Sequence, residues 1–258
     1  MQALTRPANR GWRWLFDGFL IFRKNQLMLS LAVLGYWMLM ALINTVPVIG
    51  QIAATVLIPV FSVSLMNACR TIEQGSPFPP QILFSGFHNN LRPLLVLGAI
   101  YLVASVSLLG ITALVDDGVL FQLVVLGNKP EEQALSSSEF VLAVQLALVL
   151  FSPLVMAYWF APVLVAWHDL SAGKSLFFSF VACVRNWRAF LVFCAAIMVF
   201  GALIPGLLVG LLSSFLANGG EMFSVMLTLL TVLIFLPTLY ASFYVSYRDV
   251  FVTIDEDA

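Results

Sequence analysis

The distribution of charged residues constrains this chain more than any other feature of its sequence. The 45 residues between Lys24 and Arg70 include no Asp, Glu, Lys or Arg, and four later stretches of 23 to 32 residues are also uncharged. A helix needs about 20 apolar residues to cross the hydrocarbon core of a bilayer. Only 10% of the residues are charged, whereas soluble globular proteins carry roughly 25%. The sequence therefore predicts an integral membrane protein.

The uncharged stretches predict an all-α membrane protein with six transmembrane helices. The longest stretch holds two helices because Pro47 and Gly50 interrupt it, and each of the other four holds one. We place the spans at about residues 27–46, 51–69, 94–115, 143–166, 190–212 and 223–246. Residues 1–26 are expected to form a cytoplasmic N-terminal segment, 27–247 the membrane domain and 248–258 a cytoplasmic acidic tail.

The basic residues predict the orientation of the chain. Eleven of the 12 Lys and Arg residues fall in the segments on one side of the predicted membrane, and only Lys129 falls on the other. Lys and Arg are concentrated in cytoplasmic loops. We therefore expect a multi-pass protein of the bacterial inner (cytoplasmic) membrane, with both termini cytoplasmic. The apolar run 119–126 in the outer loop is too short to span, and we expect it to rest on the outer membrane surface.

Residues 11–25 predict an amphipathic helix ahead of the first span. Its aromatic and aliphatic residues recur at spacings of three and four, which places them on one helical face: Trp12, Leu15, Phe16, Phe19 and Phe22. Such a helix can lie in the membrane interface, with its apolar face at the acyl boundary. The alternative is that this face packs on the other helices of the protein.

Short recurring phrases predict three parallel repeats of two helices each. The second span of each pair carries a proline after an apolar run: Pro59, Pro153 and Pro237. Each pair is preceded by an interfacial basic and aromatic segment, at residues 22–25, 87–92 and 185–188. Units of two spans enter the membrane in the same orientation, unlike inverted repeats. A pseudo-threefold bundle is therefore expected, in which these prolines are candidates for helix kinks or for the lining of a cavity.

The sequence offers little for catalysis. None of the predicted spans contains an ionisable Asp, Glu, Lys, Arg or His within its apolar centre, and the three cysteines lack zinc-ligand spacing. His168 and Asp169 form the closest approach to an acid–base pair, but no nucleophile motif accompanies them. We expect no enzyme, no cofactor and no metal site. The net charge of −1 also argues against binding to nucleic acid.

Basic residues beside aromatic ones give the sequence its one candidate binding feature. Each Lys or Arg close to an anionic leaflet gains about 1 kcal/mol, so these side chains are candidates for contact with anionic phospholipid headgroups. The candidates are Arg13, Arg23, Lys24, Arg92, Arg185 and Arg188. The alternative is that they serve only to orient the spans. GLLVG at 206–210 has the spacing of a helix-packing motif, which would serve packing within the bundle or a homo-oligomer.

Several longer phrases carry a resemblance. The segments GWRWLFDGFLIFRKN at 11–25, NACRTIEQGSPF at 67–78, LFSGF at 83–87, YWFAPVLVAWHD at 158–169 and FFSFVACVRNWRAF at 177–190 resemble an uncharacterised family of polytopic inner-membrane proteins from proteobacteria. The resemblance implies a six-span bacterial membrane protein and supplies no substrate or catalytic residue.

Two functions follow from these features. The first is a non-enzymatic inner-membrane protein that organises the membrane, assists assembly or binds partners through lipid and protein contacts. The second is a transporter, channel or flippase that uses the centre of the bundle. A cavity lined by Tyr36, Gln51 or Gln145 would favour the second.

Overall fold

The computed structural model describes residues 2–128, 130–215 and 220–252, and these form helices joined by short connections. The α-helices are α1 (Arg10–Lys24), α2 (Gln26–Asn44), α3 (Ile49–Glu73), α4 (Leu91–Thr112), α5 (Val119–Phe121), α6 (Glu132–Leu135), α7 (Ser138–Trp159), α8 (Ala161–His168), α9 (Ala172–Arg185), α10 (Trp187–Met198), α11 (Ile204–Phe215) and α12 (Gly220–Val250). The 3-10 helix η1 (Pro80–His88) and the π-helical turns η2 (Gln122–Leu126) and η3 (Val199–Leu203) complete the helical elements.

Six helical stretches are long and apolar enough to cross a membrane, as the sequence predicts. They are Gln26–Asn44, Ile49–Glu73, Leu91–Thr112, Ser138–His168, Trp187–Leu211 and Val225–Val250. The second helix begins two residues earlier and ends four residues later than expected, and the last extends to Val250. These two helices extend past the predicted span ends because the chain stays helical beyond the apolar core, where the first charged side chains lie.

The residues divide into two compact units. Unit 1 comprises residues 1–42, 61–89 and 182–258, and unit 2 comprises 43–60 and 90–181. α2 and α3 contribute to both, so this division does not follow the three expected helix pairs. The threefold repeat stays a prediction.

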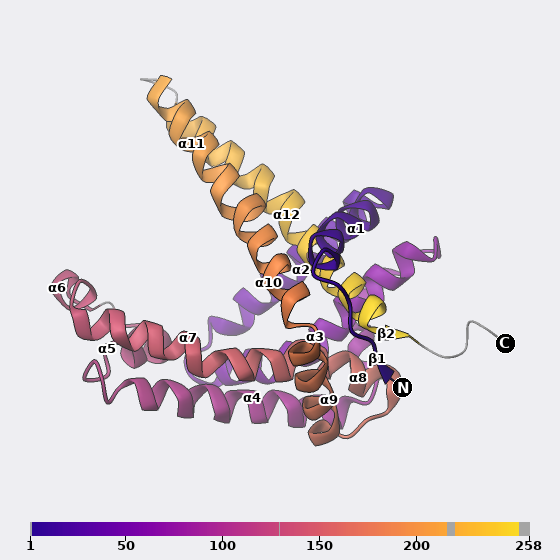
Figure 1. Cartoon of the computed structure of the whole chain (residues 1–258), viewed down its shortest axis with the longest axis horizontal. Helices are drawn as coiled ribbons and strands as arrows, with labels where there is room; N and C mark the ends of the chain where they lie inside the picture. Colours follow the sequence, from indigo (N-terminus) through magenta and orange to yellow (C-terminus); the bar gives the residue numbers. More distant parts are fainter. Residues whose placement is uncertain (1, 129, 216–219, 253–258) are drawn as a thin grey trace. The chain divides into compact units, whose positions relative to one another are not determined.

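In unit 1, α1 packs along α10 and α12 (Figure 1). Its buried residues are Gly11, Trp14, Leu15, Gly18, Ile21 and Phe22. A Cβ on Gly18 would lie 2.5 Å from the backbone nitrogen of Ser242 in α12, so only glycine permits this close approach. The expected aromatic face is thereby divided: Leu15 and Phe22 are buried, whereas Trp12 and Phe16 are exposed.

The ends of the described chain meet in a short strand pair within unit 1. β1 (Gln2–Ala3) runs antiparallel to β2 (Phe251–Val252), with Ala3 opposite Phe251. The backbone nitrogen of Leu4 also donates to the carbonyl of Val250 at 2.9 Å. This pairing adds two residues of strand at each end to an otherwise helical architecture. It also places Arg248 and Asp249 in the last turn of α12 and not in a tail, while residues 253–258 lie outside the described residues.

In unit 2, α4 and α7 run side by side (Figure 1). The run 119–126, expected on the membrane surface, forms α5 and η2, and its Leu120 is buried with Leu109 and Ala143. Asp116 fixes the start of α5, because its carboxylate accepts from the backbone nitrogens of Gly118 and Leu120 at 3.1 and 2.7 Å. The segment therefore folds back on the ends of α4 and α7.

The fourth span is interrupted at Phe160, between α7 and α8. Ser179 of α9 inserts its hydroxyl there: Oγ accepts from the Phe160 nitrogen at 2.9 Å and donates to the Met156 carbonyl at 2.8 Å. In an unbroken helix these two backbone groups would bond to each other. A side chain inserted into the hydrogen-bond ladder is a recognised cause of kinks. The interruption lies beside Pro162 in the first turn of α8, within a stretch that the apolar pattern alone describes as one continuous span.

The three prolines singled out as kink or cavity residues all lie inside continuous helices. Pro59 is within α3, Pro153 within α7 and Pro237 within α12. Pro59 and Pro237 are buried and Pro153 is exposed. Membrane helices tolerate proline where neighbouring groups satisfy the freed carbonyl.

Candidate functional site

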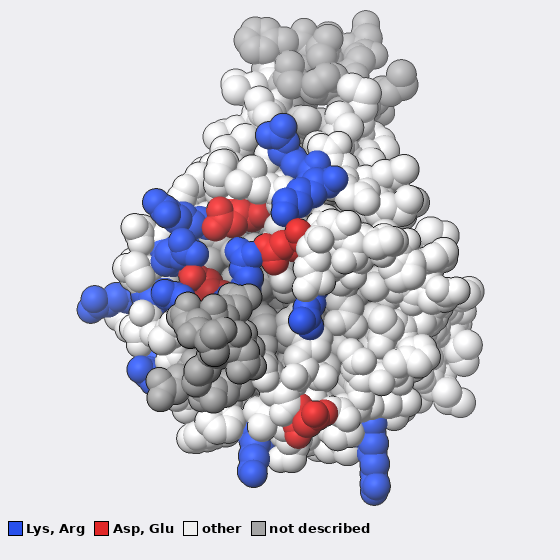
Figure 2. Space-filling view, turned by 90° about the vertical axis from the view of Figure 1, so that its right-hand side faces the viewer, with Lys and Arg blue, Asp and Glu red and all other residues white. Residues whose placement is uncertain are grey.

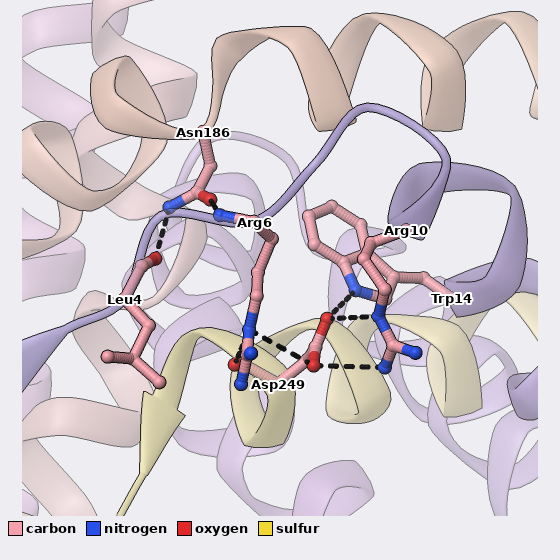
Figure 3. A network of polar contacts seen from close by, with 6 residues as sticks. All are labelled: Leu4, Arg6, Arg10, Trp14, Asn186 and Asp249. Atoms are coloured by element: carbon pink, nitrogen blue, oxygen red, sulfur yellow. Dashed lines mark hydrogen bonds and ion pairs between the residues drawn. The ribbon is translucent and has the colours of Figure 1, made fainter.

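The densest polar network of the described residues surrounds Asp249 at the end of α12. Arg10 donates to both carboxylate oxygens, from Nε to Oδ2 at 2.8 Å and from Nη2 to Oδ1 at 2.9 Å. Trp14 Nε1 donates to Oδ2 at 2.7 Å. Arg6 Nε forms an ion pair with Oδ1 at 3.3 Å and donates to the Asp249 carbonyl at 2.7 Å. Figure 3 shows the carboxylate enclosed between the two arginines.

Asn186 extends this network to the connection between α9 and α10. Its Oδ1 accepts from the backbone nitrogen of Arg6 at 2.7 Å, and its Nδ2 donates to the Leu4 carbonyl at 2.9 Å (Figure 3). The Asn186 side chain therefore takes the place of a neighbouring strand for the N-terminal segment. Because Asn186 is buried, these bonds are not exchanged with water.

A second carboxylate, Glu73 at the end of α3, binds the same terminal region of α12. Its Oε2 accepts from the Tyr244 hydroxyl at 2.6 Å, and its Oε1 forms an ion pair with Arg248. Lys24 Nζ donates to the Glu73 carbonyl at 3.2 Å. Glu73 thus joins the ends of α1, α3 and α12.

These two networks hold the N-terminal segment and α1 on the membrane domain. The hydrogen bonds that Arg10 donates to Asp249 raise the pKa of Arg10 above its usual value, because they stabilise the charged guanidinium. The charged side chains of both networks are held by one another. We infer a structural role for both networks.

The outer side of α1 carries the feature best suited to binding. Trp12 and Phe16 are 43% and 49% exposed, and Trp12 contacts Phe200 with ring centroids 5.2 Å apart. An apolar pocket of about 290 Å³ opens beside them. It is lined by Trp12, Leu15, Phe16, Phe19, Phe200, Ile234, Phe235 and Thr238. An exposed apolar pocket of this kind suits a hydrocarbon chain.

All six predicted headgroup residues are exposed. Five belong to unit 1 (Arg13, Arg23, Lys24, Arg185 and Arg188), and Arg92 belongs to unit 2. The guanidinium of Arg188 lies 5.4 Å from the ring centroid of Trp187, which is itself exposed. Figure 2 shows Lys and Arg side chains gathered on one face, with acidic side chains among them. Arg13 follows Trp12 directly, so charge and apolar pocket occur on one helix.

Unit 2 contains a larger cavity of about 670 Å³. Its polar lining residues are Asn44, Gln51, Thr55, Tyr101 and Ser105, and the remaining lining residues are apolar. Of the three polar residues expected at a cavity, Gln51 is there. Tyr36 packs between Phe61 and Tyr240 in unit 1, and Gln145 lies on the exposed side of α7.

Asp169 of the expected acid–base pair belongs to a hydrogen-bonded connection between α8 and α4. The carboxylate of Asp169 accepts a hydrogen bond from Asn90 Nδ2, and the same amide donates to the Val165 carbonyl at 3.1 Å. These bonds tie the end of α8 to the start of α4. No group of three or more His, Cys, Asp or Glu side chains within the described ranges is arranged to hold a metal ion.

Comparison with known proteins agrees with this architecture. The chain is 36% identical over 258 residues to a probable inner membrane protein of Burkholderia thailandensis, covering 97% of this chain and 94% of that protein. The chain belongs to the family of this inner membrane protein. Its six apolar helices fit a multi-pass protein of the inner membrane. No family model and no solved structure matches the chain.

Proposed function

We propose that this protein is a non-enzymatic organiser of the inner membrane, which binds anionic phospholipid through the outer side of α1. One observation carries the proposal: α1 carries exposed aromatic rings and an exposed arginine, and its aromatic residues line an apolar pocket together with residues of η3 and α12. The acyl chain of a bound lipid lies against Phe16 and Phe19, and its phosphate is neutralised by Arg13. Arg23, Lys24, Arg185 and Arg188 extend the basic surface, and in unit 2 Arg92 adds a further contact.

The proposal includes the orientation and the repeat. Both termini are cytoplasmic, because the exposed basic residues then meet the anionic cytoplasmic leaflet. The three proline-bearing helices belong to three parallel helix pairs. A protein partner or a second copy binds along α11, where the space around Gly206 is open for a second helix within the described residues.

Lipid binding is tested with the purified protein in nanodiscs, titrated with phosphatidylglycerol against phosphatidylcholine by native mass spectrometry. Replacing Arg13, Arg23 and Lys24 together by Gln is expected to weaken phosphatidylglycerol binding about 100-fold, from about 1 kcal/mol per charge. Lys174→Gln, an exposed lysine of α9, is the matched control. Phe16→Ala is expected to weaken the binding of both lipids, whereas Leu20→Ala, outside the pocket, leaves the binding of both unchanged. Equal binding of the two lipids by the native protein would contradict the proposal.

The unit 2 cavity supports the second function, transport through the protein. Transport requires that one site be reached from both sides of the membrane in turn. Thr55→Cys is introduced into a variant whose three native cysteines are replaced. Its labelling by a membrane-impermeant maleimide tests whether the cavity is reached from both sides of the membrane. Labelling of intact cells and of inverted vesicles alike favours a conduit. Labelling from one side only favours a binding cavity.

A further inference from the structure

The cavity of unit 2 has a composition that defines the chemistry of a ligand. Gln51 and Thr55 are four residues apart on α3, and Tyr101 and Ser105 are four residues apart on α4. Residues four apart share a helical face. Two polar pairs on different helices therefore line one cavity whose other walls are apolar, and a volume of about 670 Å³ lies within the usual range of ligand pockets.

Among the described residues that line the cavity, none has a charged side chain. The chain between α4 and α7 carries four acidic residues, Asp116, Asp117, Glu131 and Glu132, against the single Lys129, and a fifth, Glu139, lies in the first turn of α7. An anionic headgroup at this end of the unit would meet like charges. The cavity thus favours an uncharged amphiphile.

The cavity lies within the depth of one leaflet. It lies at the end of α4 away from Arg92, from the middle of the helix at Tyr101 to Leu109 near its last residue, Thr112. The eleven residue steps from Tyr101 to the helix end at Thr112 span about 16 Å, so the cavity lies within about half of a hydrocarbon core of about 30 Å. Val124, Val125 and Leu126 of η2 line the same cavity. A lipid that enters from the leaflet has room for one chain.

Ser105 adds a polar group that the protein itself does not satisfy. Its Oγ is buried and has no hydrogen-bond partner among the residues that the structure describes. A buried, unpaired hydroxyl is destabilising. A rotation about χ1 lets this hydroxyl donate to an ester oxygen of a ligand in the cavity.

We propose that the unit 2 cavity binds a glycerolipid without net charge from the outer leaflet, with its ester groups along the Gln51–Thr55 and Tyr101–Ser105 pairs and one acyl chain against the apolar walls. This site is separate from the anionic-lipid site proposed on α1, although its assignment to the outer leaflet uses the orientation proposed above. The α1 site prefers an anionic headgroup, and the cavity prefers a headgroup without net charge.

Photocross-linking in nanodiscs tests the proposal. The probes are phosphatidylethanolamine and phosphatidylglycerol that carry the same diazirine acyl chain, and the modified residues are mapped by mass spectrometry. We expect phosphatidylethanolamine to label cavity residues of α3, α4 and η2 about fivefold more than phosphatidylglycerol, the effect of one charge near a surface. Labelling of the exposed α7 residues Leu148 and Val149 gives the background.

Two variants and a control decide the outcome. Ser105→Phe fills the cavity and is expected to abolish the excess labelling, whereas Val103→Phe on the exposed side of α4 retains it. If Ser105→Phe does not fold, Thr55→Leu makes the same comparison. Labelling of the cavity at the α7 background level, or equal labelling by the two headgroups, overturns the proposal. Labelling on α1 is scored separately, so failure at one site does not decide the other.

Discussion

The ion-pair network at Asp249 allows the strongest single test of how the N-terminal segment is held. Asp249→Asn keeps the shape of the side chain but replaces one carboxylate oxygen by an NH₂ group. Oδ2 accepts from Arg10 and Trp14, and Oδ1 accepts from Arg10 and pairs with Arg6. Either orientation of the amide therefore places a donor against two donors, so the loss is two hydrogen bonds at Oδ2, or one hydrogen bond and the ion pair with Arg6 at Oδ1.

The size of the effect follows from the exposure of the partners. Asp249 has a side chain only 9% exposed, but Arg6 and Arg10 are 29% and 27% exposed, so solvent screens part of the interaction. Breaking a buried ion pair costs about 3–5 kcal/mol and an exposed one about 0–1 kcal/mol. We expect about 2–3 kcal/mol for Asp249→Asn, which corresponds to a roughly 30- to 150-fold larger population in which α1 is detached.

The assay is limited trypsin digestion of the protein in detergent or nanodiscs, followed at Arg10 and Arg13. Cleavage of a transiently opened segment tracks its open population, so Asp249→Asn is expected to be cut about 30- to 150-fold faster. The matched control is Asp117→Asn, an exposed aspartate with a left-handed backbone that Asn also tolerates. Cleavage of Asp249→Asn within about twofold of this control, which is under 0.5 kcal/mol, would refute the reasoning.

Three further substitutions and one control test the packing by thermal unfolding. Gly18→Ala places a methyl group against the backbone of Ser242 and is expected to destabilise by about 1–3 kcal/mol, whereas Gly110→Ala, with open space around it, is expected to be neutral or slightly stabilising. Ser179→Ala removes the hydroxyl inserted at the α7–α8 break; a loss of about 1–3 kcal/mol is expected, and an unchanged melting temperature would contradict that role. Asp116→Ala removes two bonds to the start of α5 and is expected to cost about 1–2 kcal/mol, measured also as faster hydrogen exchange of residues 118–121.

The six helices could be predicted from the sequence because their cause is local. A stretch without charge must satisfy its backbone within the membrane, and a helix does so with bonds inside the segment. The distance between Lys24 and Arg70, with Pro47 and Gly50 in its middle, is enough to indicate two helices. Membership of an inner-membrane family was expected from the resemblance of several longer phrases, and the 36% identical relative confirms it.

The role of the polar residues could not be predicted in the same way, because their partners are distant in the sequence. Arg10 and Asp249 are 239 residues apart. In the sequence, Asp249 is visible only as an aspartate that follows the last span. The amphipathic pattern of α1 identified the helix but not which face packs. The glycines at 11 and 18 were the overlooked signal, since they mark the face that approaches a neighbouring backbone.

The sequence by itself determined the number and position of the membrane helices and the location of the basic residues, since these depend on composition along the chain. Only the tertiary structure decided that Asp249 joins the N-terminal segment and α1 to the end of α12, and that Ser179 interrupts the fourth span. It also decided that Gln51, Thr55, Tyr101 and Ser105 share one cavity. Each depends on side chains from different helices meeting in space, and helical periodicity specifies a face without specifying its partner.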